Sequence, residues 1–257
     1  MTGNMSGEQK EISVRAWAQA LARSFLIQSV WNNERMQNIG FAYSISPLIN
    51  SGGEEENRRK IEAHLEFFNT NPYFASAVIG AVGRMEGDRR GAEDVRSFKR
   101  SLMGPFGALG DSLFWCSMKP AAALVGVSIA IGGRMLWAIV ATLVIYNSLH
   151  LWARLWGFYN GASLGRWMLY RFTRIRFARS AALLGLTTAV LLAWVTVWGG
   201  IWGDPLSAVI GGHYLVAGAI GSGIVLLSSM AIGRGMGAET LFYLAGGIAL
   251  AASLTIG

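Results

Sequence analysis

The feature that most constrains this chain is a long run without charge near its C-terminus, Ser180–Gly203. A helix that crosses a bilayer needs about 20 mostly apolar residues, because the hydrocarbon is about 30 Å thick and each residue rises about 1.5 Å. Two further candidates follow, Leu206–Gly233 and Ala238–Gly257. Buried helices of soluble proteins are rarely this long and this uniformly apolar. The sequence therefore predicts an all-α integral membrane protein with about three C-terminal transmembrane helices.

Composition and charge placement agree with this prediction. Hydrophobic residues make up 53% of the chain and charged residues 14%, and the 33 glycines and 10 tryptophans are typical of packed spans and membrane interfaces. The net charge is +7, but arginines gather in Arg166–Arg179, directly before the first long span. We therefore predict no nucleic-acid partner. The positive-inside rule places this block and the N-terminus in the cytoplasm and Gly257 outside.

Residues that carry enzyme chemistry are few and scattered. Cys116 is the single cysteine, and the three histidines, His64, His150 and His213, stand in no nucleophile–base pair and no metal-ligand spacing. The sequence therefore predicts no catalytic residue, no metal site and no cofactor. It divides by composition into an amphipathic helical region (1–100), a broken-helix region (101–160), a basic cytoplasmic linker (161–179) and transmembrane helices (180–257).

The N-terminal region shows helical periodicity from residue 13 to about residue 40. Near its end Trp31, Glu34, Arg35 and Asn38 stand at i, i+3, i+4 and i+7, so they share one face of the predicted helix, with Asn32 beside it. Such a face is either solvated or lines a polar cavity. Against a membrane the cavity is the better explanation, because uncompensated charges in hydrocarbon are costly.

Two amide side chains follow in the segment Asn69-Thr-Asn71-Pro72. Residues 44–59 are predicted to be a solvated loop and 60–68 a helix, which ends before the proline because the residue preceding a proline avoids the α region. A further short helix is predicted over 73–85. Asn69 and Asn71 have two explanations. They cap helix ends, or they present hydrogen-bonding groups to a polyhydroxylated ligand.

Helix-breaking residues then appear inside an apolar stretch, Gly104–Gly110, which predicts a broken helix. Asp111 ends this stretch and is a functional-site candidate, because acidic residues in apolar surroundings are costly. The alternative is that Asp111 caps the next helix or pairs with Lys119. The apolar runs 121–133 and 135–149 are each short for a span, so a re-entrant hairpin and two tilted helices both remain open.

Three blocks of the first half resemble a known family: 23–49 (RSFLIQSVWNNERMQNIGFAYSISPLI), 64–80 (HLEFFNTNPYFASAVIG) and 102–120 (LMGPFGALGDSLFW…KP). They are similar to blocks of the IID membrane subunits of the mannose-family (mannose/fructose/sorbose) bacterial PEP-dependent phosphotransferase system. The resemblance implies a protein of the bacterial inner membrane that forms a sugar pathway with a IIC subunit. A partner IIB, which IIA has phosphorylated, phosphorylates the sugar, and IID itself is not phosphorylated.

The resemblance and the residue chemistry together predict a hexose site and a symmetric oligomer. Planar amides, carboxylates and an aromatic platform suit sugar hydroxyls and ring faces. The predicted substrate-binding residues are Trp31, Asn32, Glu34, Asn69, Asn71 and Asp111, and the residues predicted to balance their charge are Arg35 and Lys119. The link at Gly203–Pro205 is shorter than the polar insertion of the family, which leaves open a reduced system that regulates or scaffolds without sugar flux.

Overall fold

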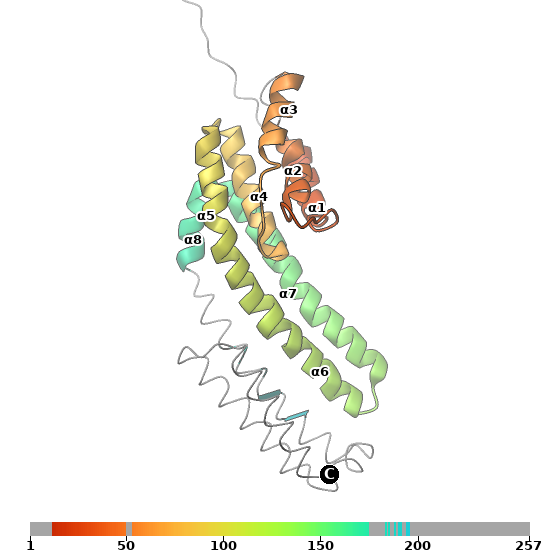
Figure 1. The fold of residues 1–257 in the computed structure, drawn as a ribbon. Coiled ribbons are helices and arrows are strands. Elements are labelled where there is room, and N and C mark those ends of the chain that lie inside the picture. Colours follow the sequence, from red (N-terminus) through yellow and green to blue (C-terminus); the bar gives the residue numbers. More distant parts are fainter. Residues whose placement is uncertain are drawn as a thin grey trace, which may run out of the picture. The chain divides into compact units, whose positions relative to one another are not determined.

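The computed structural model describes residues 12–49 and 53–174, together with a few helical positions between 183 and 195. Every regular element of the two described ranges is a helix (Figure 1), which confirms the all-α prediction. These residues form two compact units, 12–119 with 143–174 in the first and 120–142 in the second. The three predicted C-terminal spans and the N-terminal lead (1–11) lie outside the described residues, apart from those few positions.

The single helix predicted over residues 13–40 is wrong, because the segment forms two helices, α1 (Val14–Ser24) and α2 (Asn38–Ile45). Between them the backbone of Asn32 exchanges two hydrogen bonds with that of Met36, at 3.1 and 3.0 Å. The Asn32 side chain also accepts a 2.7 Å hydrogen bond from the backbone N–H of Arg35. Short polar side chains compete with helices through such local bonds, and here the loop is favoured.

This loop overturns the predicted common face of Trp31, Glu34 and Asn38. Met36 has a φ of 57°, a left-handed conformation that cannot continue a helix. Trp31 and Glu34 therefore belong to an exposed loop, whereas Asn38 is the buried first residue of α2.

The segment after α2 also differs from the prediction. Helix α2 ends at Ile45, a 3-10 turn, η1 (Ser46–Leu48), follows, and α3 (Glu54–Ala63) comes next, so the predicted loop over 44–59 is helical at both of its ends. Three glutamates in the first turn favour the helix N-terminus, and Arg58 pairs with Glu55 at 2.8 Å and with Glu62 at 3.3 Å. The helix predicted over 60–68 thus begins earlier and ends earlier than expected.

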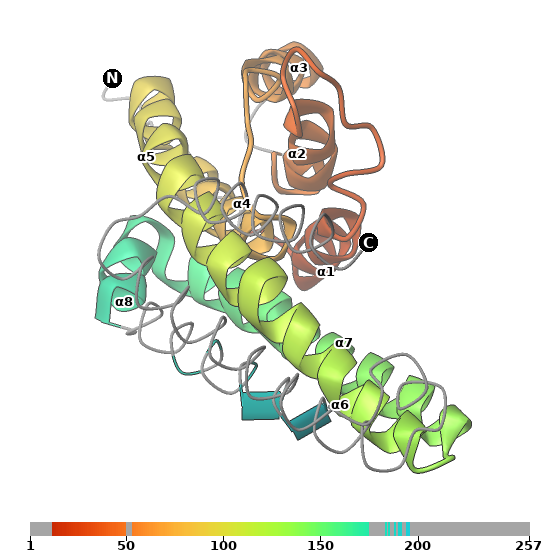
Figure 2. The same cartoon turned by 60° about the horizontal axis from the view of Figure 1, so that its bottom comes forward.

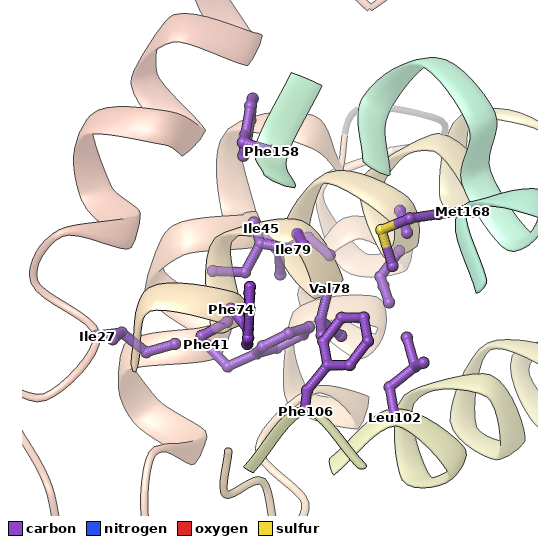
Figure 3. Packing of buried hydrophobic residues seen from close by; sticks show 14 of the residues in the cluster. Ile27, Phe41, Ile45, Phe74, Val78, Ile79, Leu102, Phe106, Phe158 and Met168 are labelled. Atoms are coloured by element: carbon purple, nitrogen blue, oxygen red, sulfur yellow. The ribbon is translucent and has the colours of Figure 1, made fainter. Parts of the chain in front are cut away.

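Helix α4 (Pro72–Gly87) forms the core of the first unit, and a helix over residues 73–85 was predicted. It lies between α5 (Ala92–Gly110) and the group α1, α2 and α3, which stand together in both views (Figures 1 and 2). Every residue of α4 from Pro72 to Gly83 is buried. Figure 3 shows Phe74 and Val78 of α4 facing Phe106 of α5. Burial of each such side chain contributes about 1.5–3 kcal/mol.

The break predicted at Gly104–Gly110 is wrong. Helix α5 continues through Pro105 to Gly110, the wider π-helical segment η2 (Asp111–Met118) follows, and α6 (Lys119–Ile131) comes next. Interrupting a helix in apolar surroundings leaves backbone N–H and C=O groups without hydrogen-bond partners. That costs more free energy than keeping one proline inside the helix. Gly110 is glycine for a steric reason, because a Cβ there would collide with the Asn71 side chain.

The remaining described helices are α7 (Met135–Leu164), η3 (Gly165–Trp167) and α8 (Met168–Arg174). The two short apolar runs are parts of longer helical stretches, Ala92–Ile131 and Met135–Phe172, which are long and apolar enough to cross a membrane by length and composition. Within the second unit α6 contacts the start of α7. A Cβ at Gly126 would collide with Thr142 there.

Helices α4 and α7 approach each other through small residues. A Cβ at Gly161 of α7 would collide with the backbone of Ala77 and Ala81 in α4. A Cβ at Gly80 would likewise meet the backbone oxygen of Phe158. Small residues let helix backbones come this close, as in helix pairs within membranes.

Candidate functional site

Two loops of the first unit pair with each other, and we call residues 31–38 and 65–71 the paired loops. The backbone N–H of Gln37 donates to the oxygen of Phe68 at 2.8 Å, and that of Phe68 donates to the oxygen of Arg35 at 3.4 Å. Met36 and Phe68 form a short parallel bridge. These backbone bonds place the first two sequence blocks of the family resemblance side by side.

Buried amide side chains reinforce the pairing. Gln37 donates from Nε2 to the backbone oxygen of Thr70 at 2.8 Å, and its Oε1 accepts from the Thr70 N–H at 3.2 Å. Asn38 donates to the oxygen of Leu65 at 2.8 Å and accepts from the Asn32 side chain at 2.9 Å. Buried polar groups with their partners in place fix one conformation, so the paired loops are held rigidly.

The third block reaches the same place through α5 and η2. The Thr70 hydroxyl donates to the backbone oxygen of Met103 at 3.2 Å, and the Asn69 N–H contacts the sulfur of Met103 at 3.3 Å. Asn71 donates from Nδ2 to Oδ1 of Asp111 at 3.0 Å. Three blocks far apart in sequence therefore converge on the start of α4.

Of the predicted substrate residues, the structure brings Asn71 and Asp111 into direct contact. Asn71 is buried and is also the N-cap of α4, because its side chain accepts from the N–H of Tyr73 at 3.1 Å. Asp111 is exposed. Among the described ion pairs none joins Asp111 to Lys119, and the Lys119 ammonium lies 5.3 Å from the centre of the Trp115 ring instead. Asn71 thus serves as a cap and as a partner of Asp111 at once.

The other predicted residues are spread over the paired loops. Trp31 is half-exposed, Glu34 is exposed beside it, and Asn32 is used in holding the loop. Arg35 donates to the backbone oxygen of Leu65 at 3.4 Å rather than to a carboxylate. Asn69 is exposed. No hydrogen bond within the described residues links Trp31 or Glu34 to the Asn71–Asp111 pair.

Sequence reasoning missed an aromatic cluster around Tyr73. Its ring stacks on His150 at 4.8 Å and meets Trp115 at 5.6 Å, and its hydroxyl bonds that of Tyr146 at 2.6 Å. Arg154 lies 5.1 Å from the ring centre, is buried, and donates to the oxygen of Ser24 at 3.0 Å. Arg154 could have been found from the sequence, because a charge inside a long apolar run is a functional-site hypothesis by default.

A second group that sequence reasoning missed is an ion-pair cluster beside the paired loops. Glu66 contacts Lys99 at 3.1 Å, Arg96 at 3.2 Å and Arg100 at 3.5 Å. Lys99 is fully buried, and its ammonium lies 4.5 Å from the centre of the Phe41 ring. A buried charge is tolerated when it is paired, so this cluster fastens α5 to the second of the paired loops.

A small cavity of about 90 Å³ adjoins this cluster, among the ends of α3 and α4 and the start of α5. Glu86 lines it and contacts His64 at 3.2 Å and Lys60 at 3.7 Å. Burial raises the pKa of Glu86, but the contacts with His64 and Lys60 outweigh it and hold that pKa below its usual value. None of the predicted site residues lines this cavity, and no cluster in the described residues has the ligands for a metal ion.

Most of the sequence matches a known family. The model of the PTS system mannose/fructose/sorbose family IID component matches residues 11–198, a range that contains all three converging blocks. The chain belongs to this family. The match confirms the resemblance drawn from the sequence. Members are membrane proteins, in agreement with the two helical stretches that are long and apolar enough to span.

Individual IID proteins resemble this chain over stretches of different length. The PTS system mannose-specific EIID component of Escherichia coli K12 is 37% identical over 151 residues, 56% of this chain and 53% of that protein. The chain thus spans about half the length of this relative. The fructose permease IID component of Bacillus subtilis 168 is 27% identical over 205 residues, 75% of this chain and 74% of the relative.

Solved structures show the same likeness. A chain in the cryo-EM structure of the mannose transporter ManYZ with microcin E492 is 30% identical, with 72% of this chain and 71% of that chain covered and a TM-score of 0.58. A second structure, described as a membrane protein, gives a TM-score of 0.64 at 30% identity and the same coverage.

Proposed function

We propose that this protein is the membrane subunit of a sugar phosphotransferase transporter and forms the hexose pathway with a IIC subunit. In this proposal a partner IIB, which IIA has phosphorylated, phosphorylates the sugar, and the IID chain itself performs no catalysis. The observation that carries the proposal is the convergence of the three family blocks on the start of α4. Three blocks that each stabilised only their own helix would not need to meet at one point.

The chemistry at this point suits a polyhydroxylated ligand. Asp111 offers an exposed carboxylate, which accepts several hydrogen bonds from hydroxyl groups. Its orientation is set by the Asn71 amide, which is itself fixed by its capping bond to α4. The predicted residues Asn32, Glu34 and Asn69 belong to the paired loops and complete the proposed site.

The proposed IIC partner follows from the surface of α7. Large apolar side chains are exposed along it, among them Leu136, Trp137, Val144 and Trp152. Lipid or a partner helix must cover them, because water is a poor solvent for so large an apolar surface. We propose that both do so in a symmetric assembly, in keeping with the ManYZ structure, which contains a similar chain.

The decisive experiment measures hexose uptake and phosphorylation in cells that express this chain with its IIC, IIB and IIA partners and no other hexose system. Uptake that depends on the chain supports the proposal. A stable IIC complex that moves and phosphorylates no hexose contradicts it and favours the regulatory alternative.

A sharper variant separates binding from capping at Asn71. Asn71→Ser keeps an N-cap side chain but removes the amide that donates to Asp111. We expect the hexose KM to rise by the equivalent of about 1–3 kcal/mol with α4 intact, because a partner group is left unpaired. Asp111→Asn should act similarly. Normal KM in both variants would place the sugar site on the partner subunit.

The proposed topology has its own test. Arg166–Arg179 is expected in the cytoplasm of a bacterial inner membrane, with the N-terminus on the same side and Gly257 outside. A reporter enzyme active only in the cytoplasm, fused after Gly257, is expected to be inactive. Activity of that fusion would require an even number of spans after Arg179.

A further inference from the structure

A π-helical segment of eight residues, η2 (Asp111–Met118), stands where the three family blocks converge. π-Helices are rare, they occur mostly as single turns, and they are frequent at functional sites. The wide turn is visible in a side-chain bond, since the Ser117 hydroxyl donates to the oxygen of Ser112, five residues earlier, at 2.8 Å. Such a segment presents its side chains differently from an α-helix, so its residues at the site require an explanation.

Two contacts fix which residues of η2 face the start of α4. Asp111 accepts from the side chain of Asn71 at 3.0 Å, and the Trp115 ring meets the ring of Tyr73 with centres 5.6 Å apart. The two partners are two residues apart at the beginning of one helix. Asp111 and Trp115, four residues apart on η2, therefore face the same part of the molecule.

Trp115 is open to a ligand, whereas the residue before it is not. Its side chain is 39% exposed, while Phe114 is buried against Tyr73 and Phe74. The Lys119 ammonium lies over the ring, 5.3 Å from its centre. An aromatic face, a carboxylate and an ammonium thus stand on successive turns of one continuous helical stretch.

We propose that the indole of Trp115 is the platform on which the hexose ring stacks, with Asp111 binding its hydroxyls. The inference rests on the proposed function and names the aromatic residue of its site. An aromatic ring covers the apolar C–H face of a sugar, and a carboxylate near the ring binds the hydroxyls at the sugar's edge. The flexible Lys119 side chain, whose ammonium lies over the ring, has to move aside when the sugar stacks there. The Asn71 amide keeps the carboxylate turned towards this position.

The structure favours Trp115 over Trp31, the platform predicted from the sequence. Trp31 is also half-exposed, but it belongs to the first of the paired loops, and no described contact joins it to Asp111 or Asn71. Trp115 is joined to that pair through Tyr73 and through its own helix. Trp31→Ala is therefore the matched control, because it removes the same half-exposed side chain from a neighbouring part of the same unit.

The test uses the complex of this chain with its partner subunits in membrane vesicles and measures KM and kcat for phosphorylation of mannose and fructose. Trp115→Ala is expected to raise KM about tenfold with little change in kcat, since one stacking contact is worth about 1.4 kcal/mol. Trp115→Phe, which keeps a ring, is expected to recover most of the affinity. Trp31→Ala is expected to change KM less than twofold.

Assembly of each variant is checked by co-purification with the IIC partner. If Trp115→Ala does not assemble, Trp115→Phe and Trp115→Leu are compared in assembled complexes, and a KM raised by leucine alone supports stacking. Unchanged KM in an assembled Trp115→Ala or Trp115→Leu complex overturns the inference, as does a loss confined to Trp31→Ala. A wild-type complex that neither binds nor phosphorylates any hexose overturns the proposed function and the inference with it.

Discussion

From Pro72 to Gly83, helix α4 is buried by other parts of the chain. Helix α7, in contrast, exposes large apolar side chains along most of its length. Both are apolar in sequence. In the most apolar window of the stretch Met135–Phe172 only 6% of the residues are buried within the chain. The difference shows that the apolar character of a helix does not reveal what its side chains pack against. The described helices cover α4, and the same helices leave most of α7 uncovered.

A substitution at the contact between α4 and α7 should have the largest effect on stability. In Gly161→Ala the new methyl group would collide with the backbone of Ala77 and Ala81, which cannot swing aside as a side chain can. We expect a loss of about 2–3 kcal/mol of unfolding free energy, measured as a lower thermal midpoint in detergent.

The same change at Gly107 is the control for this prediction. Nothing lies within 4 Å of a Cβ built at Gly107, so Gly107→Ala should be neutral or should stabilise α5 by about 0.5–1 kcal/mol. Equal midpoints for the two variants would mean that α4 and α7 do not approach as closely as described here.

A charge on the outer side of α7 tests what covers that helix. Val144 is 57% exposed, and in a soluble protein Val144→Lys would cost little. In a bilayer we expect a cost of about 2 kcal/mol, seen as reduced insertion in a membrane-integration assay. Val144→Leu serves as the control. Insertion of Val144→Lys at the wild-type level would show that this face meets water.

Matched truncations compare the two apolar helices directly. Val78 is fully buried in α4, so Val78→Ala should lower the unfolding free energy by about 1–2 kcal/mol through lost contacts and a small cavity. Val144→Ala should change it by less than about 0.5 kcal/mol in the same detergent. Similar costs at both positions would break the distinction between the two helices.

The smallest expected effect concerns pH at the polar end of α4. The pKa of Glu86 is held below its usual value by His64 and Lys60, so its ionised form stabilises the folded state. That contribution is present above about pH 4.5 and is lost as the pH falls through the lowered pKa. Thermal midpoints of the wild type and of Glu86→Gln should therefore differ at pH 6 and converge in acid. A constant difference across this range would contradict the assignment.

The sequence anticipated α4 well and the region before it poorly. Uninterrupted apolar residues after Asn71-Pro72 define both the start and the burial of α4. The helical periodicity before Gly40 was equally visible, but Asn32 and Met36 close a loop whose hydrogen bonds to Phe68 come from a distant part of the chain. Neighbouring residues do not indicate such a distant partner, so periodicity alone gave the wrong prediction of one continuous helix.

By itself the sequence determined the all-α class, the membrane character and the family, because long charge-free runs and the three blocks are local properties of the chain. It also singled out Asn71 and Asp111, since each is a polar residue placed beside helix-breaking residues in apolar surroundings. Only the tertiary structure decided that these two touch, and that Trp115, Tyr73 and Arg154 lie near them. The reason is physical. Their positions depend on how closely helices α4, α5 and α7 pack, and that closeness is set by Gly110 and Gly161, where the absence of a side chain lets distant backbones meet.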